Sequence, residues 1–208
     1  FSLYESSGEV TVFGEKFELN KLGNALSKGI VSVSEDRRNV GLLLDMSIEE
    51  NIVFGAMQTN DDFLKKNIVK LKDVRKIREH SNKMIKDMDI RCTGPTQPVG
   101  RLSGGNQQKV CISKAITMNP KILFVSEPTR GIDIGAKELV LNKLVELNNK
   151  EGLTIIVISS ELAELRSICD RIAIISSGKV VDIFSPDAKD SDFGLAMSGI
   201  RKEGAHIG

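Results

Sequence analysis

Residues 101–109 read RLSGGNQQK, and residues 127–133 read EPTRGID at the end of an apolar run. The stretch between these two segments has the length of one helix followed by one strand. A serine and two glycines that open a helix present backbone N–H groups to an anion, and a carboxylate at a strand end can polarise water beside a phosphate. The ordered pair therefore predicts that the chain binds nucleotide phosphates.

Helices and strands alternate from residue 104 onward, which predicts an α/β fold. The expected helices cover residues 104–118, 136–148 and 161–168, and the expected strands cover residues 122–125, 154–159 and 171–176. Such alternation implies right-handed crossovers and a parallel sheet with helices on its faces. Ligands bind at the carboxyl ends of the strands in such sheets, where Glu127 and Ser160 lie. A turn at Ser177 and Gly178 then leads into residues 179–184, which predicts a closing hairpin. We therefore expect residues 103–184 to form the core that carries the site and residues 185–208 to form a polar, loosely held tail.

The N-terminal part, residues 1–35, is expected to form an antiparallel edge and the first core strand. Residues 10–13 and 16–19 flank Gly14, a turn residue between two short β-type runs, and so predict a hairpin. Residues 29–33 are a compact β-branched run that predicts a strand, and polar residues follow it. Polar side chains at a strand end usually line the rim of a site.

Residues 36–102 are expected to form an inserted helical subdomain. Ser47 and Glu50 fit a capping box, so a helix should begin near Ile48. Residues 61–89 are rich in charge, with apolar positions at mostly helical spacing. The excess of Lys and Arg there is most simply a solvated helix face, which favours a structural reading over nucleic-acid binding.

Composition narrows the class of protein. The chain has 208 residues and a net charge of +1, with 29 Lys and Arg against 28 Asp and Glu. This balance removes the electrostatic argument for nucleic acid as a main partner. The three cysteines lack metal-ligand spacing, which favours a reduced compartment and no metal site. The longest aliphatic runs are far too short to span a bilayer, so we expect any membrane contact to be peripheral.

Residues 102–108, LSGGNQQ, resemble the signature motif of ABC-type ATPases, which closes over a nucleotide held by a partner domain. We call them the signature segment. The resemblance implies that Ser103, Gly104, Gly105 and Gln107 contact the nucleotide, with the Ser103 hydroxyl and the glycine N–H groups donating to phosphate oxygens. A side chain at either glycine would block this approach. An ordinary Ser-Gly helix cap is the alternative, and the downstream motif at this distance disfavours it.

Residues 122–129, ILFVSEPT, resemble the Walker B strand of the same family. The family places a metal-orienting Asp where this chain has Ser126, whose neutral hydroxyl can hold a metal-bound water but lacks the charge. Glu127 keeps the position of the general base and is the predicted catalytic residue. An exposed strand-end carboxylate is the alternative for Glu127. Asp133 matches the D-loop, which runs along the dimer interface in the family.

Two more positions depart from the family pattern. Ser160 stands at the place of the switch histidine that contacts the γ-phosphate, and Glu35 stands at the place of the Q-loop glutamine. A serine cannot carry that charge, and a carboxylate accepts hydrogen bonds without donating them. The chain also contains no Gly-x-x-x-x-Gly-Lys-Ser/Thr loop and begins at Phe1, so we expect a fragment that starts after that loop or lacks it. These departures predict a degenerate ATP site.

Over residues 7–184 the chain resembles the second nucleotide-binding half of carbohydrate-import ABC ATPases, tandem proteins in which two ATPase halves face each other head to tail. The resemblance implies one ABC ATPase domain, residues 1–208, that uses ATP and Mg²⁺ at the cytoplasmic face of the cell membrane. The implied partners are the N-terminal ATPase half, membrane permease subunits and, indirectly, a sugar-binding protein, but no nucleic acid. Closure of the paired halves would drive the permease, and the isolated fragment would be inactive.

Other functions remain open at this point. The departures from the family pattern are also typical of a non-hydrolysing ABC-like module that only binds a partner. Nucleoside importers share this ATPase pattern, and the sugar itself is chosen by the binding protein and the permease. A soluble ABC ATPase of translation or DNA repair is disfavoured by the neutral charge and the short helical insertion.

Overall fold

The computed structural model describes residues 7–19, 22–65 and 71–200. It divides into two compact units, Phe1–Ile158 and Ser159–Gly208. The division falls within residues 103–184, which we expected to form one core. Those parts of the predictions that concern residues 1–6, 20–21, 66–70 and 201–208 lie outside the described residues.

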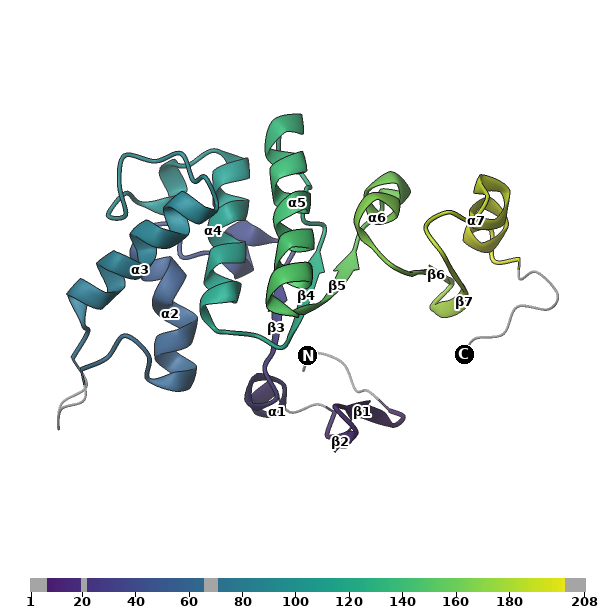
Figure 1. The fold of residues 1–208 in the computed structure, drawn as a ribbon, viewed down its shortest axis with the longest axis horizontal. Coiled ribbons are helices and arrows are strands. Elements are labelled where there is room, and N and C mark those ends of the chain that lie inside the picture. Colours follow the sequence, from purple (N-terminus) through teal and green to yellow (C-terminus); the bar gives the residue numbers. More distant parts are fainter. Residues whose placement is uncertain (1–6, 20–21, 66–70, 201–208) are drawn as a thin grey trace. The chain divides into compact units, whose positions relative to one another are not determined.

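A parallel three-stranded sheet forms the centre of the first unit (Figure 1). Its strands, in spatial order, are β3 (Ile30–Val33), β4 (Ile122–Ser126) and β5 (Thr154–Ile158). Helices α4 (Gly104–Thr117) and α5 (Ile134–Glu151) pack against this sheet, where Leu123 and Val125 are 0% exposed. The β-branched residues that favour strands also fill this interface. The predicted α/β fold with a parallel core is confirmed, and the carboxyl ends of β3 and β4 meet at one edge.

The N-terminal hairpin is confirmed as well. Strands β1 (Val10–Val12) and β2 (Glu15–Phe17) pair antiparallel around Gly14, whose φ of 78° is the left-handed conformation that this tight turn needs. They form a two-stranded sheet of their own. The apolar residues of the hairpin and of α1 (Leu22–Ser27) pack on the sheet through one cluster, made of Val12, Ala25 and Ile30 with Phe17, Ile122 and Phe124.

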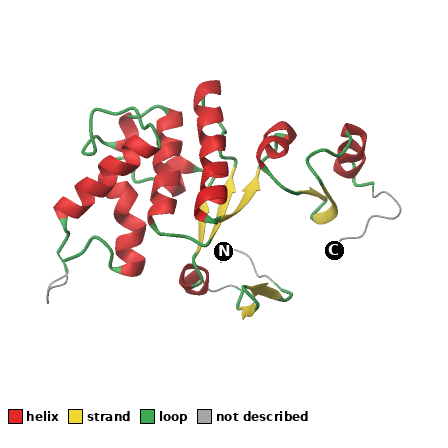
Figure 2. Cartoon of the chain, viewed as in Figure 1, coloured by secondary structure: helices red, strands yellow, loops and turns green. Residues whose placement is uncertain are grey.

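Helices dominate residues 36–102, as predicted, and they appear as red ribbons in Figure 2. The elements are η1 (Arg37–Gly41), α2 (Ile48–Asn60), α3 (Val74–Asp87) and η2 (Val99–Arg101). Ser47 and Glu50 form the full capping box at the start of α2. Helix α2 packs closely on α4. The absence of a side chain at Gly55 permits this approach, since a Cβ atom there would lie only 2.6 Å from Met118 Sδ.

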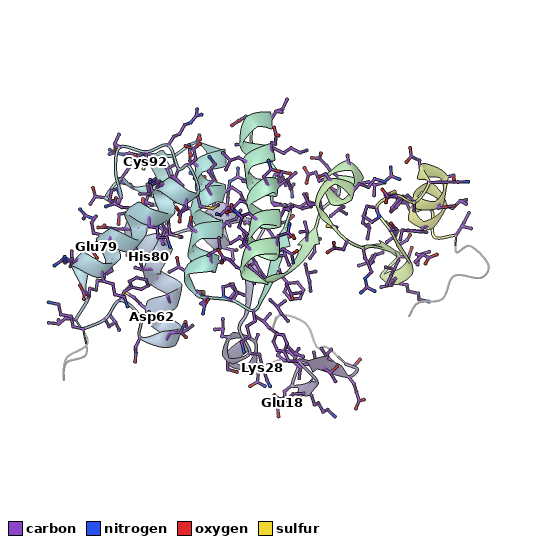
Figure 3. All side chains as sticks on the ribbon, in the orientation of Figure 1. Glu18, Lys28, Asp62, Glu79, His80 and Cys92 are labelled. Atoms are coloured by element: carbon purple, nitrogen blue, oxygen red, sulfur yellow. The ribbon has the colours of Figure 1, made fainter. Side chains whose placement is uncertain are left out.

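Helix α3 is joined to α4 through His80, which Figure 3 labels. Its Nε2 atom lies 2.9 Å from Thr117 Oγ1, and its ring contacts the Phe63 ring at a tilt of 52°, with the two centroids 5.0 Å apart. Burial lowers the pKa of His80, so the neutral ring is favoured there. Burial favours the neutral form of Cys111 as well, and it raises the pKa of this thiol to about 12. The Cys111 side chain therefore contributes to packing.

The second unit contains α6 (Leu162–Ile168), β6 (Ile172–Ser176), β7 (Lys179–Phe184) and α7 (Asp190–Met197). Strand β6 pairs antiparallel with β7 in a two-stranded sheet, which confirms the closing hairpin predicted from the turn at Ser177 and Gly178. The prediction of a loosely held tail is wrong for α7, because Phe193 and Ala196 are each 1% exposed and pack on Ile172 and Ile174. Three-residue spacing of these two apolar side chains on one helix face is the signal that was missed.

No helix in the described part of the chain is both long and apolar enough to span a bilayer.

Candidate functional site

The signature segment lies at the start of α4, a helix of 14 residues. Ser103 occupies the N-cap position with extended backbone, yet its side chain makes no capping bond to the helix. Instead Asn106 Nδ2 donates to Ser103 Oγ over 2.9 Å. Because Oγ accepts this bond and the residue is exposed, the hydroxyl hydrogen can be donated outward.

The loop before α4 braces this segment. The backbone N–H of Arg91 donates to Asn106 Oδ1 over 2.9 Å, which fixes the amide so that its nitrogen faces Ser103. Lys109, whose side chain is only 5% exposed, donates through Nζ to the carbonyl of Asp89 over 2.7 Å. A buried lysine is rare unless it is paired in this way. Sequence reasoning missed this brace, since its members lie 15 and 20 residues apart.

The two glycines of the segment are required by packing within this chain. A Cβ atom on Gly104 would lie 2.9 Å from Arg37 Nη2 and 2.9 Å from the Gly131 carbonyl oxygen. A Cβ atom on Gly105 would lie 2.9 Å from the Cβ atom of Ala136 in α5. From the sequence, glycine was expected at both positions because a side chain would block the approach of phosphate to the backbone. The structure adds a second reason, since a side chain at either position would also collide with neighbouring residues of this chain.

Gln107 does not face the same space as Ser103. Its side chain is 1% exposed, and its Nε2 atom donates to the carbonyls of Val99 and Leu102, each over 3.3 Å. The structure thus places the Gln107 side chain inside the fold, and its contact with the nucleotide stays a prediction. The side chain points inward because the backbone carbonyls of the η2 turn need donors.

Glu127 follows the last residue of β4, Ser126, at the carboxyl edge of the sheet. Its backbone has a φ of 46°, and its N–H donates to the Ile158 carbonyl at the end of β5 over 2.7 Å. For a residue other than glycine, the left-handed region costs roughly 1–2 kcal/mol. Outliers of this kind cluster at functional sites, where the surrounding structure holds them. The half-buried Glu127 carboxylate therefore stands on a strained turn at the sheet edge.

The loop of residues 127–133 is tied to the segment that follows β3. Arg130 Nη1 contacts Glu35 Oε2 at 3.0 Å, and both side chains are more than half exposed, at 67% and 52%. Arg37 donates from the other direction to the carbonyls of Arg130 and Gly131. Asp133 caps α5 by accepting from the N–H of Ala136 over 2.9 Å. Glu35, Asp133 and the signature glycines are thus brought into one neighbourhood.

Ser160 belongs to the second unit, at the start of α6. Beside it, Ser159 Oγ donates to Glu164 Oε2 over 3.1 Å, and Glu164 is 3% exposed. The site of the first unit accordingly comprises Glu35, Ser126, Glu127, Asp133 and residues 103–105. Across residues 7–19, 22–65 and 71–200, no three His, Cys, Asp or Glu side chains gather to hold a metal ion.

The family model described as "ABC transporter" matches residues 2–130. This chain belongs to the ABC transporter family.

Curated relatives of this ABC protein are named as sugar import proteins. The ribose import ATP-binding protein RbsA of Caldanaerobacter subterraneus subsp. tengcongensis is 40% identical over 181 residues, which cover 86% of this chain and 35% of that relative. The xylose import ATP-binding protein XylG of Thermoanaerobacter pseudethanolicus is 40% identical over 188 residues, which cover 89% of this chain and 35% of that relative. The chain therefore spans about a third of the length of the curated relatives that it matches.

Solved structures show the same fold. The dimeric ABC cassette MJ0796 in a post-hydrolysis state bound to ADP and Pi superposes with a TM-score of 0.70 at 21% identity, covering 88% of this chain and 75% of that one. The protein cbiO1 from Clostridium perfringens gives a TM-score of 0.68 at 23% identity, covering 93% of this chain and 70% of that one. The fold of this chain is that of an ABC ATPase cassette.

Proposed function

We propose that this chain is the C-terminal nucleotide-binding half of a carbohydrate importer's ATPase, and that its signature segment completes an ATP site in the N-terminal half. The proposal is supported by the exposure of Ser103 and by the hydrogen bond that its hydroxyl accepts. Its hydroxyl accepts from Asn106 and is exposed at the start of a 14-residue helix, so its hydrogen is available to an incoming phosphate. The adjoining N–H groups of Gly104 and Gly105 lie in the first turn, where helix backbone N–H groups have no intrahelical acceptor.

The chemistry of the ATP site follows from these donors. Water attacks the γ-phosphorus, its proton passes to a carboxylate of the partner half, and the bond to the ADP oxygen breaks. Negative charge on the transferred phosphoryl group is stabilised by Ser103 Oγ–H, the two glycine N–H groups and the positive end of the helix dipole. Because the donors come from one half and the phosphate loop from the other, hydrolysis requires that the halves close on the nucleotide.

The Glu127 site of this chain is proposed to be degenerate. Ser126 supplies no charge for a metal, and the described residues offer no acidic cluster beside it. Glu35 is engaged by Arg130, so its carboxylate is held by a cation of the same chain. These residues do not fit a tightly held Mg²⁺ ion in this half, and we assign the Mg²⁺ that accompanies ATP to the partner half's site. Glu127 would be the general base for any slow turnover here.

The relatives' names support sugar as the imported substrate, and ribose or xylose is the class that they suggest. We place the protein peripherally at the cytoplasmic face of the membrane, with permease subunits and, through them, a sugar-binding protein as partners. Dimer closure would drive the permease as a two-state motion. The isolated chain is expected to hydrolyse no ATP.

The test is Ser103→Arg in the full-length protein assembled with its permease. A long cation in place of the hydroxyl blocks the approach of phosphate, and we expect sugar-stimulated hydrolysis to fall by at least about 100-fold. Ser191→Arg, an exposed serine of α7, is the matched control and should retain activity. If the Ser103 variant folds normally by circular dichroism and keeps full activity, Ser103 does not act as a phosphate donor and the proposed function is wrong.

A second candidate is a non-hydrolysing ABC-like module that only assembles with a partner, which the neutral Ser126 favours. Calorimetric titration of Mg-ATP into this chain, alone and mixed with the N-terminal half, separates the two. Binding and turnover only in the mixture supports the shared site. A mixture that binds no more ATP than the N-terminal half alone, and that gains no turnover, supports the assembly module.

A further inference from the structure

The Arg37 guanidinium connects two loops that are far apart in the sequence. Its Nη1 atom donates to the carbonyl of Arg130 over 2.7 Å, and its Nη2 atom donates to the carbonyl of Gly131 over 3.3 Å. The partners lie 93 and 94 residues further along the chain. A planar guanidinium can hold two successive carbonyls at once, whereas the ammonium of a lysine is a single point on a flexible stem.

The same guanidinium forms the wall against which the signature segment packs. Its Nη2 atom would lie 2.9 Å from a Cβ atom on Gly104 and 3.4 Å from a Cβ atom on Gly131. Arg37 Nε is buried and has no hydrogen-bond partner within the described residues. Leaving a buried donor unpaired costs free energy, so the side chain is held here by its two terminal bonds and by packing.

The turn that carries Arg37 is attached to α4 at its other end as well. This turn, η1 (Arg37–Gly41), is π-helical and is capped by Asp36, which accepts from the N–H of Asn39. At the end of the turn, Lys114 Nζ donates to the carbonyl of Gly41 over 3.0 Å. A Cβ atom on Gly41 would lie 3.1 Å from Cys111 Sγ. The turn therefore follows α4 along most of its length, from Gly104 to Lys114.

We propose that Arg37 is a positioning residue for the signature segment. By clamping the carbonyls of Arg130 and Gly131, it makes the η1 turn, the start of α4 and the loop before α5 move as one body. Ser103 and the glycine N–H groups then keep a fixed position relative to Asp133. Arg37 itself touches no nucleotide. This inference rests on the proposed role of the signature segment as a phosphate donor.

The test compares Arg37→Lys and Arg37→Gln with Arg38→Lys and Arg38→Gln in the full-length protein. Arg38 is the adjacent, exposed residue of the same type and serves as the matched control. Two quantities are measured: kcat and KM for ATP, and hydrogen exchange of the amides of residues 107–111 without nucleotide.

Both Arg37 variants should lower kcat by about 10-fold or more, since a misplaced donor group can cost up to about 100-fold. KM for ATP should stay within about twofold, because an interaction made only in the transition state is lost. Exchange of the amides of residues 107–111 should quicken in both, and the Arg38 variants should match the wild type. Lysine should not replace arginine, because its single ammonium group cannot hold the two carbonyls in the way that the guanidinium does.

Two results would overturn the inference. Full kcat in Arg37→Lys with loss in Arg37→Gln would mean that only the charge matters. Unchanged exchange and unchanged kcat in Arg37→Lys would mean that the clamp positions nothing, and this variant decides the question if Arg37→Gln fails to fold. If Ser103→Arg also leaves kcat intact, the proposed function fails, while the exchange data still report whether Arg37 holds the segment.

Discussion

The start of α4 and the end of β4 are both candidate phosphate-facing regions, but they are built differently. At the start of α4, contacts from three other segments hold Ser103 and the two glycines, and the Ser103 hydroxyl can donate outward. At the end of β4, Ser126 is neutral and Glu127 stands on a strained backbone. The start of α4 is therefore suited to donate hydrogen bonds to a phosphate held by another domain, whereas the end of β4 is poorly suited to hold a metal ion.

The largest expected effect tests this contrast directly. Ser103→Ala removes one positioned donor and should lower sugar-stimulated hydrolysis of the full-length protein by about 100-fold. Glu127→Gln removes the proton acceptor of the degenerate site and should change the same rate by less than about threefold, because the partner half's site carries the flux. Steady-state phosphate release at saturating ATP measures both. Equal losses in the two variants would show that both regions contribute alike to hydrolysis.

A smaller effect concerns the packing of the signature segment. Gly105→Ala places a methyl group 2.9 Å from the Cβ atom of Ala136, and we expect a loss of about 1–3 kcal/mol in the free energy of unfolding. Urea denaturation measures it. Ala136→Gly removes the opposing methyl group, so the double variant should recover part of the loss. Strictly additive losses in this cycle would show that the two residues do not compete for the same space.

The smallest effect concerns the strained turn at Glu127. Glu127→Gly relieves the left-handed backbone and should raise the free energy of unfolding by about 1 kcal/mol. Asn119→Gly, at a φ of 52° away from the site, is the control for such relief and should gain less, because asparagine tolerates this region. If thermal denaturation shows no increase in stability for Glu127→Gly, contacts of the Glu127 side chain offset the cost of the left-handed backbone.

Prediction from sequence succeeded where the signal is local. The capping box at Ser47, the hairpin at Gly14 and the strands of the parallel core each depend on residues within a few positions of one another. Prediction was less accurate where packing decides which way a side chain faces. Gln107 was expected at the nucleotide but turns inward to the carbonyls of the preceding turn, and α7 was expected to be part of a loose tail.

The order of the elements could be read from the sequence, and so could the Ser103 segment that opens α4 and the lack of charge at Ser126. Hydrophobic periodicity, glycine placement and side-chain chemistry are properties of individual residues and their near neighbours. Only the tertiary structure decided that Gly104 packs on Arg37 and that Arg37 clamps a loop 93 residues away. Such contacts have no local pattern, since they form when burial of separate apolar faces brings distant donors and carbonyls together.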